Sequence, residues 1–252
     1  MYKYTQICIA ISSIILLFKL GKEQNLYFLI GMHTMFLIIT YIITHLMEIL
    51  CPNLKIQKGK DSLKTLFSEY LTGFFPIIIW NSQLITLLTS DYSRSIMNIN
   101  YAPTDSTLFY LFQIIIQQFS HDIYVFAVHK YILHSKYFWF MHKTHHIKTP
   151  SLMTAFTLSV WENAIQSIDL IITANIFGMH NDALMASLTF ATMVGLYSHI
   201  GYELFPSWWS KCVWTNWYIN TSYHDLHHSN GNCNYGYILT CYDKLTGSYK
   251  SV

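Results

Sequence analysis

The sequence predicts an all-α protein, a bundle of several transmembrane helices with a cap on one side of the membrane. Its composition indicates this class: hydrophobic residues make up 52% of the 252 residues and charged residues only 11%, against about a quarter in an average soluble domain. A chain with so few charges is expected to have lipid as its solvent. The formal net charge of +2 is too small to indicate a nucleic-acid partner.

Apolar segments along the chain could supply the membrane spans. They cover residues 6–18, 25–50, 66–90, 107–133, 159–177 and 183–205. The second, third and fourth have the length of about 20 apolar residues that a span needs. The first is expected to be an uncleaved anchor, and the last two are expected to form a hairpin.

The lysines predict the orientation and the two-part organisation. They gather in residues 51–64, in residues 130–148 and in the tail after residue 210. With the spans placed as above, these regions share one side, which the positive-inside rule assigns to the cytosol, or to the matrix for a mitochondrial protein. Residues 1–105 are expected to form N-terminal membrane anchor helices, and residues 106–252 a domain with the histidine motifs described next.

Two HxxHH boxes stand out among the 13 histidines. They consist of His142, His145, His146, His224, His227 and His228. On a helix, positions i, i+3 and i+4 lie on one face within about 100° of arc, so the imidazoles of each box can converge on metal ions. Chance is a poor explanation for two such boxes in one chain, and no HExxH motif of a zincin protease occurs.

His129 and His134 are further candidate ligands. They are five residues apart, which places their side chains about 140° apart around an ideal helix. Two side chains so placed bind one metal ion poorly unless the helix ends or distorts there. With the boxes they make more ligands than one four-coordinate zinc needs, so two ions are the economical count. Imidazole suits Fe, Zn, Cu and Ni alike, so the spacing does not name the metal.

A ligating imidazole must be neutral, and its second nitrogen needs a hydrogen-bond partner. The candidates for this outer shell are Asp122, Glu162, Glu203 and Asp225, with His121 beside them. The boxes lie at the ends of predicted spans on the lysine-rich side. A metal there is placed for chemistry on a lipid, whose alkyl chain would also keep water out.

The C-terminal half resembles the fatty acid hydroxylase and sterol desaturase superfamily. The segments that carry the resemblance are residues 122–130, 142–150, 199–206, 224–228, 234–236 and 242–247. The stretches around His199 and His224 look closest to the C4-methylsterol oxidase branch. Residues 1–105 carry no resemblance beyond being apolar.

The resemblance implies a helical bundle under a cytosolic cap with two iron ions, for which zinc could substitute, and His199 as an extra ligand. It also implies O2 as co-substrate, cytochrome b5 or a reductase as electron donor, and a sterol, fatty acyl or sphingoid lipid as substrate. Hydroxylation and desaturation of an unactivated C–H bond begin with the same hydrogen abstraction, so both stay open. The endoplasmic reticulum is the expected location, with the mitochondrial inner membrane as the alternative.

The chain departs from the family pattern at two places. Leu133 occupies the position where the first family box usually has its second histidine, and Trp161-Glu162 stands where many relatives have His-Pro-x-Glu. The missing i+4 histidine of the first box and the short, loop-poor chain keep a second hypothesis open, a non-catalytic structural subunit of a larger membrane complex, for example in the mitochondrial inner membrane. A zinc-dependent membrane hydrolase is a third.

Overall fold

The computed structural model describes residues 23–56, 107–177 and 179–251. Within these ranges the chain is helical and has two isolated β-bridges but no strand. The helices are α2 (Glu23–Leu50), the 3-10 helix η1 (Pro52–Leu54), α5 (Thr107–Ala127), the π-helix η2 (Val128–Leu133), α6 (Trp139–His146), α7 (Val160–Gln166), α8 (Ile168–Phe177), α9 (Asn181–Ser198), α10 (Thr221–Asn230) and α11 (Cys241–Leu245). The predicted all-α class is therefore confirmed for the described residues.

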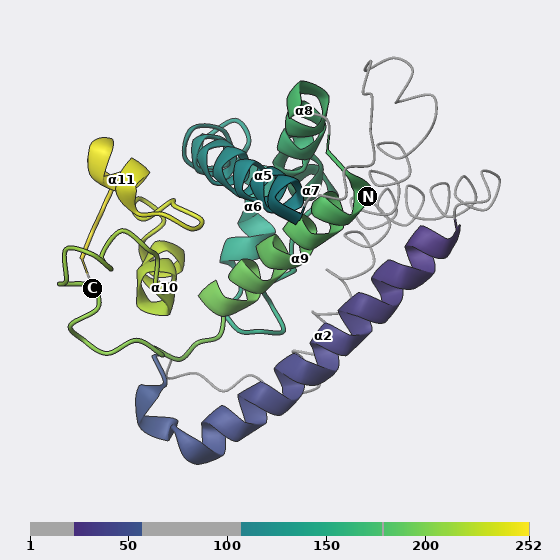
Figure 1. Ribbon diagram of the computed structural model, residues 1–252. Helices are drawn as coiled ribbons and strands as arrows, with labels where there is room; N and C mark the ends of the chain where they lie inside the picture. The colour runs from purple at the N-terminus through teal and green to yellow at the C-terminus, as the bar shows by residue number, and fades with distance from the viewer. Residues whose placement is uncertain (1–22, 57–106, 178, 252) are drawn as a thin grey trace.

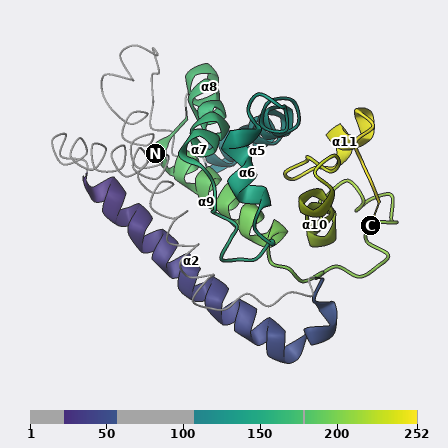
Figure 2. The ribbon, with the colours of Figure 1, turned by 180° about the vertical axis from the view of Figure 1, so that it is seen from behind.

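Three helices form the centre of the bundle (Figure 1). α5 packs against α8 and α9, and α6 contacts η2 and α7. The buried residues Leu170, Ala174, Met179, Ala183 and Leu184 form a core between α8 and α9. α2 runs along one edge of the molecule, as Figure 2 shows from behind, and the bridge between Lys55 and Tyr202 ties the segment after it to the segment after α9.

In the parts of the chain that the structure describes, no helix is both long and apolar enough to cross a membrane. The multi-span bundle therefore stays a prediction. Two of the expected spans, residues 6–18 and 66–90, lie outside the described residues.

Two other expected spans differ from the prediction. The segment 159–177 is divided into α7 and α8 at Ser167, whose hydroxyl donates to the carbonyl of Asn163. The segment 183–205 is helical only as far as Ser198, where α9 ends and the chain turns at His199. Ser167 and His199, the residues at the two breaks, both line the cavity of the site described below.

α5 buries several polar residues and exposes many apolar ones. Gln117 donates to Asp169 of α8, Gln113 accepts from the N–H of His180 just before α9, and Asp122 accepts from the N–H of Ile238, so all three are buried. The large apolar side chains on the outer face are exposed: Leu108, Phe109, Leu111, Phe112, Ile115, Phe119 and Ile123. This is the reverse of the pattern in a surface helix of a soluble protein.

Side-chain caps fix the first turns of α7 and α10. The Ser159 hydroxyl accepts from the N–H of Glu162 at the start of α7 (3.0 Å), as in a capping box. Asn220 caps α10 by accepting from the N–H of Tyr223 (2.8 Å). α10 ends at Gly231, whose φ of 70° lies in the left-handed region that glycine adopts without strain.

Candidate metal centre

Nine histidines come together at the junction of η2, α6, α9 and α10. The first group comprises His129, His134, His142, His146 and His227, and the second comprises His145, His199, His224 and His228. Within each group the nitrogens that could bind a metal lie within 4.8 Å of one another. The structure thus brings all nine histidines singled out in the sequence into two neighbouring groups.

The two boxes divide between the groups in the same way. α6 contributes His142 and His146, at i and i+4, to the first group, and the i+3 residue His145 to the second. α10 contributes the i and i+4 residues to the second group and the i+3 residue, His227, to the first. Each helix therefore holds part of both groups, so two HxxHH helices facing each other produce a paired centre.

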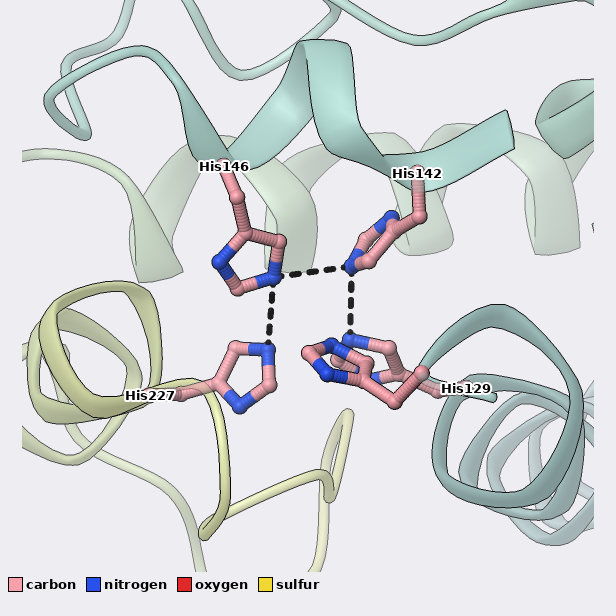
Figure 3. Close-up of side chains that lie close together, drawn as sticks. His129, His142, His146 and His227 are labelled. Carbon is pink, nitrogen blue, oxygen red and sulfur yellow. Dashed lines mark hydrogen bonds between the residues drawn. The ribbon is translucent and has the colours of Figure 1, made fainter. Parts of the chain in front are cut away.

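The side-chain nitrogens of the first group face one another (Figure 3). His142 Nε2 lies 3.0 Å from His129 Nε2 and 2.9 Å from His146 Nε2. His227 Nε2 lies 3.0 Å from His146 Nε2. In the second group, successive Nε2 atoms lie 3.2, 3.2 and 3.1 Å apart in the order His145, His199, His224, His228.

A π-helical turn brings His134 into the first group. In η2 the N–H of His134 donates to the carbonyl of His129 at 3.0 Å, an i to i+5 bond. The imidazole of His134 consequently lies 4.9 Å from that of His129 and 4.8 Å from that of His227, between ring centroids. The residue at i+4, Leu133, is fully buried in the core instead. The extra residue of the first box is therefore accommodated by a π-turn, a feature often found at functional sites.

The hydrogen bonds of the Nδ1 atoms show that the Nε2 atoms carry the lone pairs. His129 Nδ1 donates to the carbonyl of Tyr235 (3.0 Å), and His227 Nδ1 donates to that of Cys233 (2.7 Å). Since a carbonyl can only accept, each Nδ1 carries the hydrogen and each Nε2 presents a lone pair to the group. Lone pairs facing one another at about 3 Å cannot bond to each other, but they suit a cation between them. The donor set thus fits metal ions.

Burial keeps these imidazoles neutral. Desolvation, and then repulsion from neighbouring histidines, lowers the pKa of His134 to about 2. Burial likewise lowers the pKa of His146 to about 3 and holds the pKa values of His145 and His228 well below 6.5. The neutral form is the one that binds metal.

A cavity of about 150 Å³ opens onto both groups. Histidines from each group form part of its wall, namely His129, His142, His145, His199 and His224. Apolar side chains from α5, α8, α9 and the connecting loops line much of the rest, including Val125, Phe156, Leu158, Leu170, Leu188 and Ile219. An apolar molecule in this cavity would therefore lie directly against the histidines.

Comparison with known proteins identifies the family. The sequence model described as fatty acid hydroxylase matches residues 114–248, more than half of the chain. The chain belongs to the fatty acid hydroxylase family. The resemblance inferred from the boxes is confirmed, and both groups of histidines lie within the matched region.

The names of similar proteins refer to sterols as their substrates. The chain is 31% identical over 137 residues to cholesterol 25-hydroxylase of Homo sapiens, covering 52% of this chain and 48% of that protein. It is 30% identical over 133 residues to the Rattus norvegicus enzyme, covering 51% and 44%. Methylsterol monooxygenase 1 of Danio rerio is 28% identical over 125 residues, covering 49% and 42%. The matches span less than half of each relative, and no solved structure matches.

The predicted outer-shell residues have different surroundings. Glu162, fully buried, accepts from His142 Nδ1 at 2.6 Å. Asp122 instead accepts from the backbone N–H of Ile238 (2.7 Å), and Glu203 from that of Ser222 (3.0 Å).

The other two candidates also differ. Asp225 lies half-buried on α10, and His121 contacts Asp169. The carboxylate of Glu162 therefore touches a candidate ligand, as predicted. The carbonyls of Tyr235 and Cys233 take this role for other histidines, and no sequence signal could have shown it.

Replacing Glu162 with alanine is expected to weaken metal binding 10- to 100-fold, as is typical when a partner of a ligating histidine is removed. The Glu162→Gln variant retains an acceptor for His142 Nδ1 and should lose less. Asp182→Ala, at a carboxylate that is 80% exposed, is the matched control. Metal content after dialysis against a graded chelator series measures the effect. Equal retention in all three variants would contradict the role assigned to Glu162.

Asp243 carries a fully buried carboxylate whose role the sequence did not reveal. Its side chain accepts hydrogen bonds from the Tyr223 hydroxyl, the N–H of Gly236 (2.7 Å) and the Ser248 hydroxyl (2.6 Å). A Cβ on Gly236 would lie 2.3 Å from the carbonyl oxygen of Leu239, so only glycine fits this close approach. Because Tyr223 precedes His224, this network fixes α10 and its histidines.

Asp243→Asn is expected to lower the free energy of unfolding by about 1–3 kcal/mol, since an amide cannot accept from all of these donors with the strength of a carboxylate. Urea unfolding of the purified chain measures this. Asp182→Asn, at a carboxylate that is 80% exposed, serves as the control. A loss no larger than that of the control would refute the structural role of Asp243.

Proposed function

We propose that the chain is a membrane di-iron oxygenase that hydroxylates or desaturates an unactivated C–H bond of a lipid with O2. The observation that carries this proposal is the pair of histidine groups in the wall of an apolar cavity. The names of the relatives favour a sterol as substrate. A fatty acyl or sphingoid lipid remains the alternative substrate class.

The residues of the site have separate tasks in this reaction. Five histidines in the first group and four in the second would hold one iron ion each, and the bound ions supply the binding and activation of O2. Glu162 and the backbone carbonyls keep the imidazoles oriented and neutral. The apolar wall excludes water and holds the C–H bond of the lipid against the centre.

A membrane location is part of the proposal. The exposed apolar face of α5 favours lipid as its surroundings. Trp208, Trp214 and Trp217 are also exposed and would suit the headgroup level of a bilayer. We propose the endoplasmic reticulum, with the mitochondrial inner membrane as the alternative, and cytochrome b5 or a reductase as the electron donor.

The alternative of a non-catalytic subunit was motivated by Leu133 in the first box. In the structure His134 joins the first group through the π-turn, so this departure does not deprive the group of a candidate ligand. The alternative is therefore kept as an outcome of the experiment rather than as a second proposal.

Isotope labelling tests the proposed reaction. The purified chain, supplied with an electron donor, would be incubated with cholesterol, a fatty acid or a sphingoid base under ¹⁸O2. Hydroxylation is expected to place one ¹⁸O atom in the lipid, whereas desaturation yields a double bond without label. Unchanged lipids in all three incubations with an iron-loaded protein would overturn the proposal in favour of a structural subunit.

A further inference from the structure

A buried polar network lies beside the cavity on the side of α5 and α8. The Asp169 carboxylate, which is 1% exposed, accepts from Gln117 Nε2 and from His121 Nδ1, each at 2.9 Å. A buried carboxylate is costly unless it is well bonded, and an apolar pair would join two helices more cheaply. The network is therefore more than a helix–helix contact needs.

The network orients His121 toward a ligand. His121 lines the cavity. As a carboxylate only accepts, Asp169 holds a hydrogen on His121 Nδ1, and Nε2 is left as the ring nitrogen that can bond to a ligand. This Nε2 makes no hydrogen bond with any described residue. The hydroxyl group of an alcohol could hydrogen-bond to it.

A second side chain in the cavity wall lacks a partner. Asn163 also lines the cavity and is 8% exposed, yet its Nδ2 has no hydrogen-bond partner among the described residues. A buried amide left without a partner costs free energy, so a native structure is expected to satisfy it with a bound group. An oxygen atom of a ligand could accept from it.

α5 and the η2 turn that continues it set the distance between His121 and the metal centre. His121, Val125 and His129 recur every four residues on one face, and all three line the cavity. Eight residues at 1.5 Å each place His121 about 12 Å along the helix from His129. A hydroxyl at His121 would thus lie several carbon–carbon bonds from a carbon at the histidine groups.

We propose that His121 and Asn163 form a subsite that binds the hydroxyl group of an alcohol-bearing lipid and places a carbon remote from that hydroxyl at the metal centre. This inference rests on the proposed function, because it treats the cavity as the lipid site. It adds that the substrate is a lipid alcohol and that the oxidised carbon does not neighbour the hydroxyl-bearing carbon.

Binding of matched lipid pairs tests the subsite. The probes are radiolabelled cholesterol against cholestane and 1-hexadecanol against hexadecane, bound to the full chain loaded with iron in detergent. The unchanged chain is expected to bind at least one alcohol about tenfold more tightly than its hydrocarbon, as the gain of a buried hydrogen bond predicts. His121→Asn, which keeps an amide donor near Asp169, and Asn163→Leu are each expected to reduce this preference.

Thr192→Val is the matched control, because Thr192 lines the same cavity but its hydroxyl already donates to the carbonyl of Leu188 (2.8 Å). Its preference for alcohols should be unchanged. Equal affinity for alcohol and hydrocarbon, binding of neither alcohol, or an unaltered preference in His121→Asn and Asn163→Leu would overturn the subsite. Iron content and ¹⁸O incorporation measured on the same samples separate the cases: an iron-loaded, active chain without the preference refutes the subsite alone, and a chain that binds no iron refutes the proposed function.

Discussion

Alanine in place of His145 is expected to reduce lipid oxidation more than about 100-fold, beyond the loss typical for an outer-shell partner. His145 is buried in the second group, where its Nε2 lies 3.2 Å from that of His199. Its ring also lies 5.2 Å from that of His142 in the first group, between centroids. The substitution therefore removes a candidate ligand at the place where the two groups meet, and a cavity replaces it.

Product formation and iron content of the same preparations measure this effect. His45→Ala serves as the control, since His45 is an exposed histidine on α2 and stacks only loosely on Tyr41, with centroids 6.5 Å apart. The control should keep its activity and iron. A His145→Ala chain with iron and activity equal to those of the control would show that this histidine is no ligand.

Acid is expected to destabilise the metal-free chain steeply below about pH 6.5. Desolvation by burial lowers the pKa of His146 from 6.5 to about 3 in the folded chain. Between these values the unfolded chain binds a proton that the folded chain does not, so the free energy of unfolding falls as the pH falls. Each such histidine contributes about 1.4 kcal/mol per pH unit, and several histidines of the two groups share this shift.

Urea unfolding of the metal-free chain at a series of pH values between 7.5 and 5 measures the slope. The His146→Gln variant removes one titrating group and should show a shallower dependence. With iron bound the loss should be more abrupt, because protons and metal compete for the same nitrogens. A free energy of unfolding that is constant or rises toward pH 5 would contradict the neutral, desolvated state of the histidines.

The histidine boxes were predictable because their spacing is a local property of a helix. The i, i+3, i+4 pattern gave the face of α6 and of α10 before any tertiary contact was known. How each box divides between two groups depends on how the helices face each other, so the spacing alone could not show it. The i+5 spacing of His129 and His134 was judged poor on an ideal α-helix, and the π-turn that accommodates it forms in the tertiary context of the buried Leu133.

Other features of the site had no signal in the sequence. Backbone carbonyls such as that of Tyr235 orient ligands, and any residue has one. Asp243 and Asp169 act through donors more than four residues away, most of them on other segments of the chain. Gln117 and His121 belong to a network with Asp169 that meets the cavity, and no spacing in the sequence linked these three residues.

The iron content of the purified full chain is the most direct test of the paired metal centre. The account predicts close to two irons per chain, with a large loss when His199 and His224 of the second group are both replaced by alanine. A chain that folds, keeps its histidines and yet binds no metal on incubation with ferrous iron or zinc would contradict it.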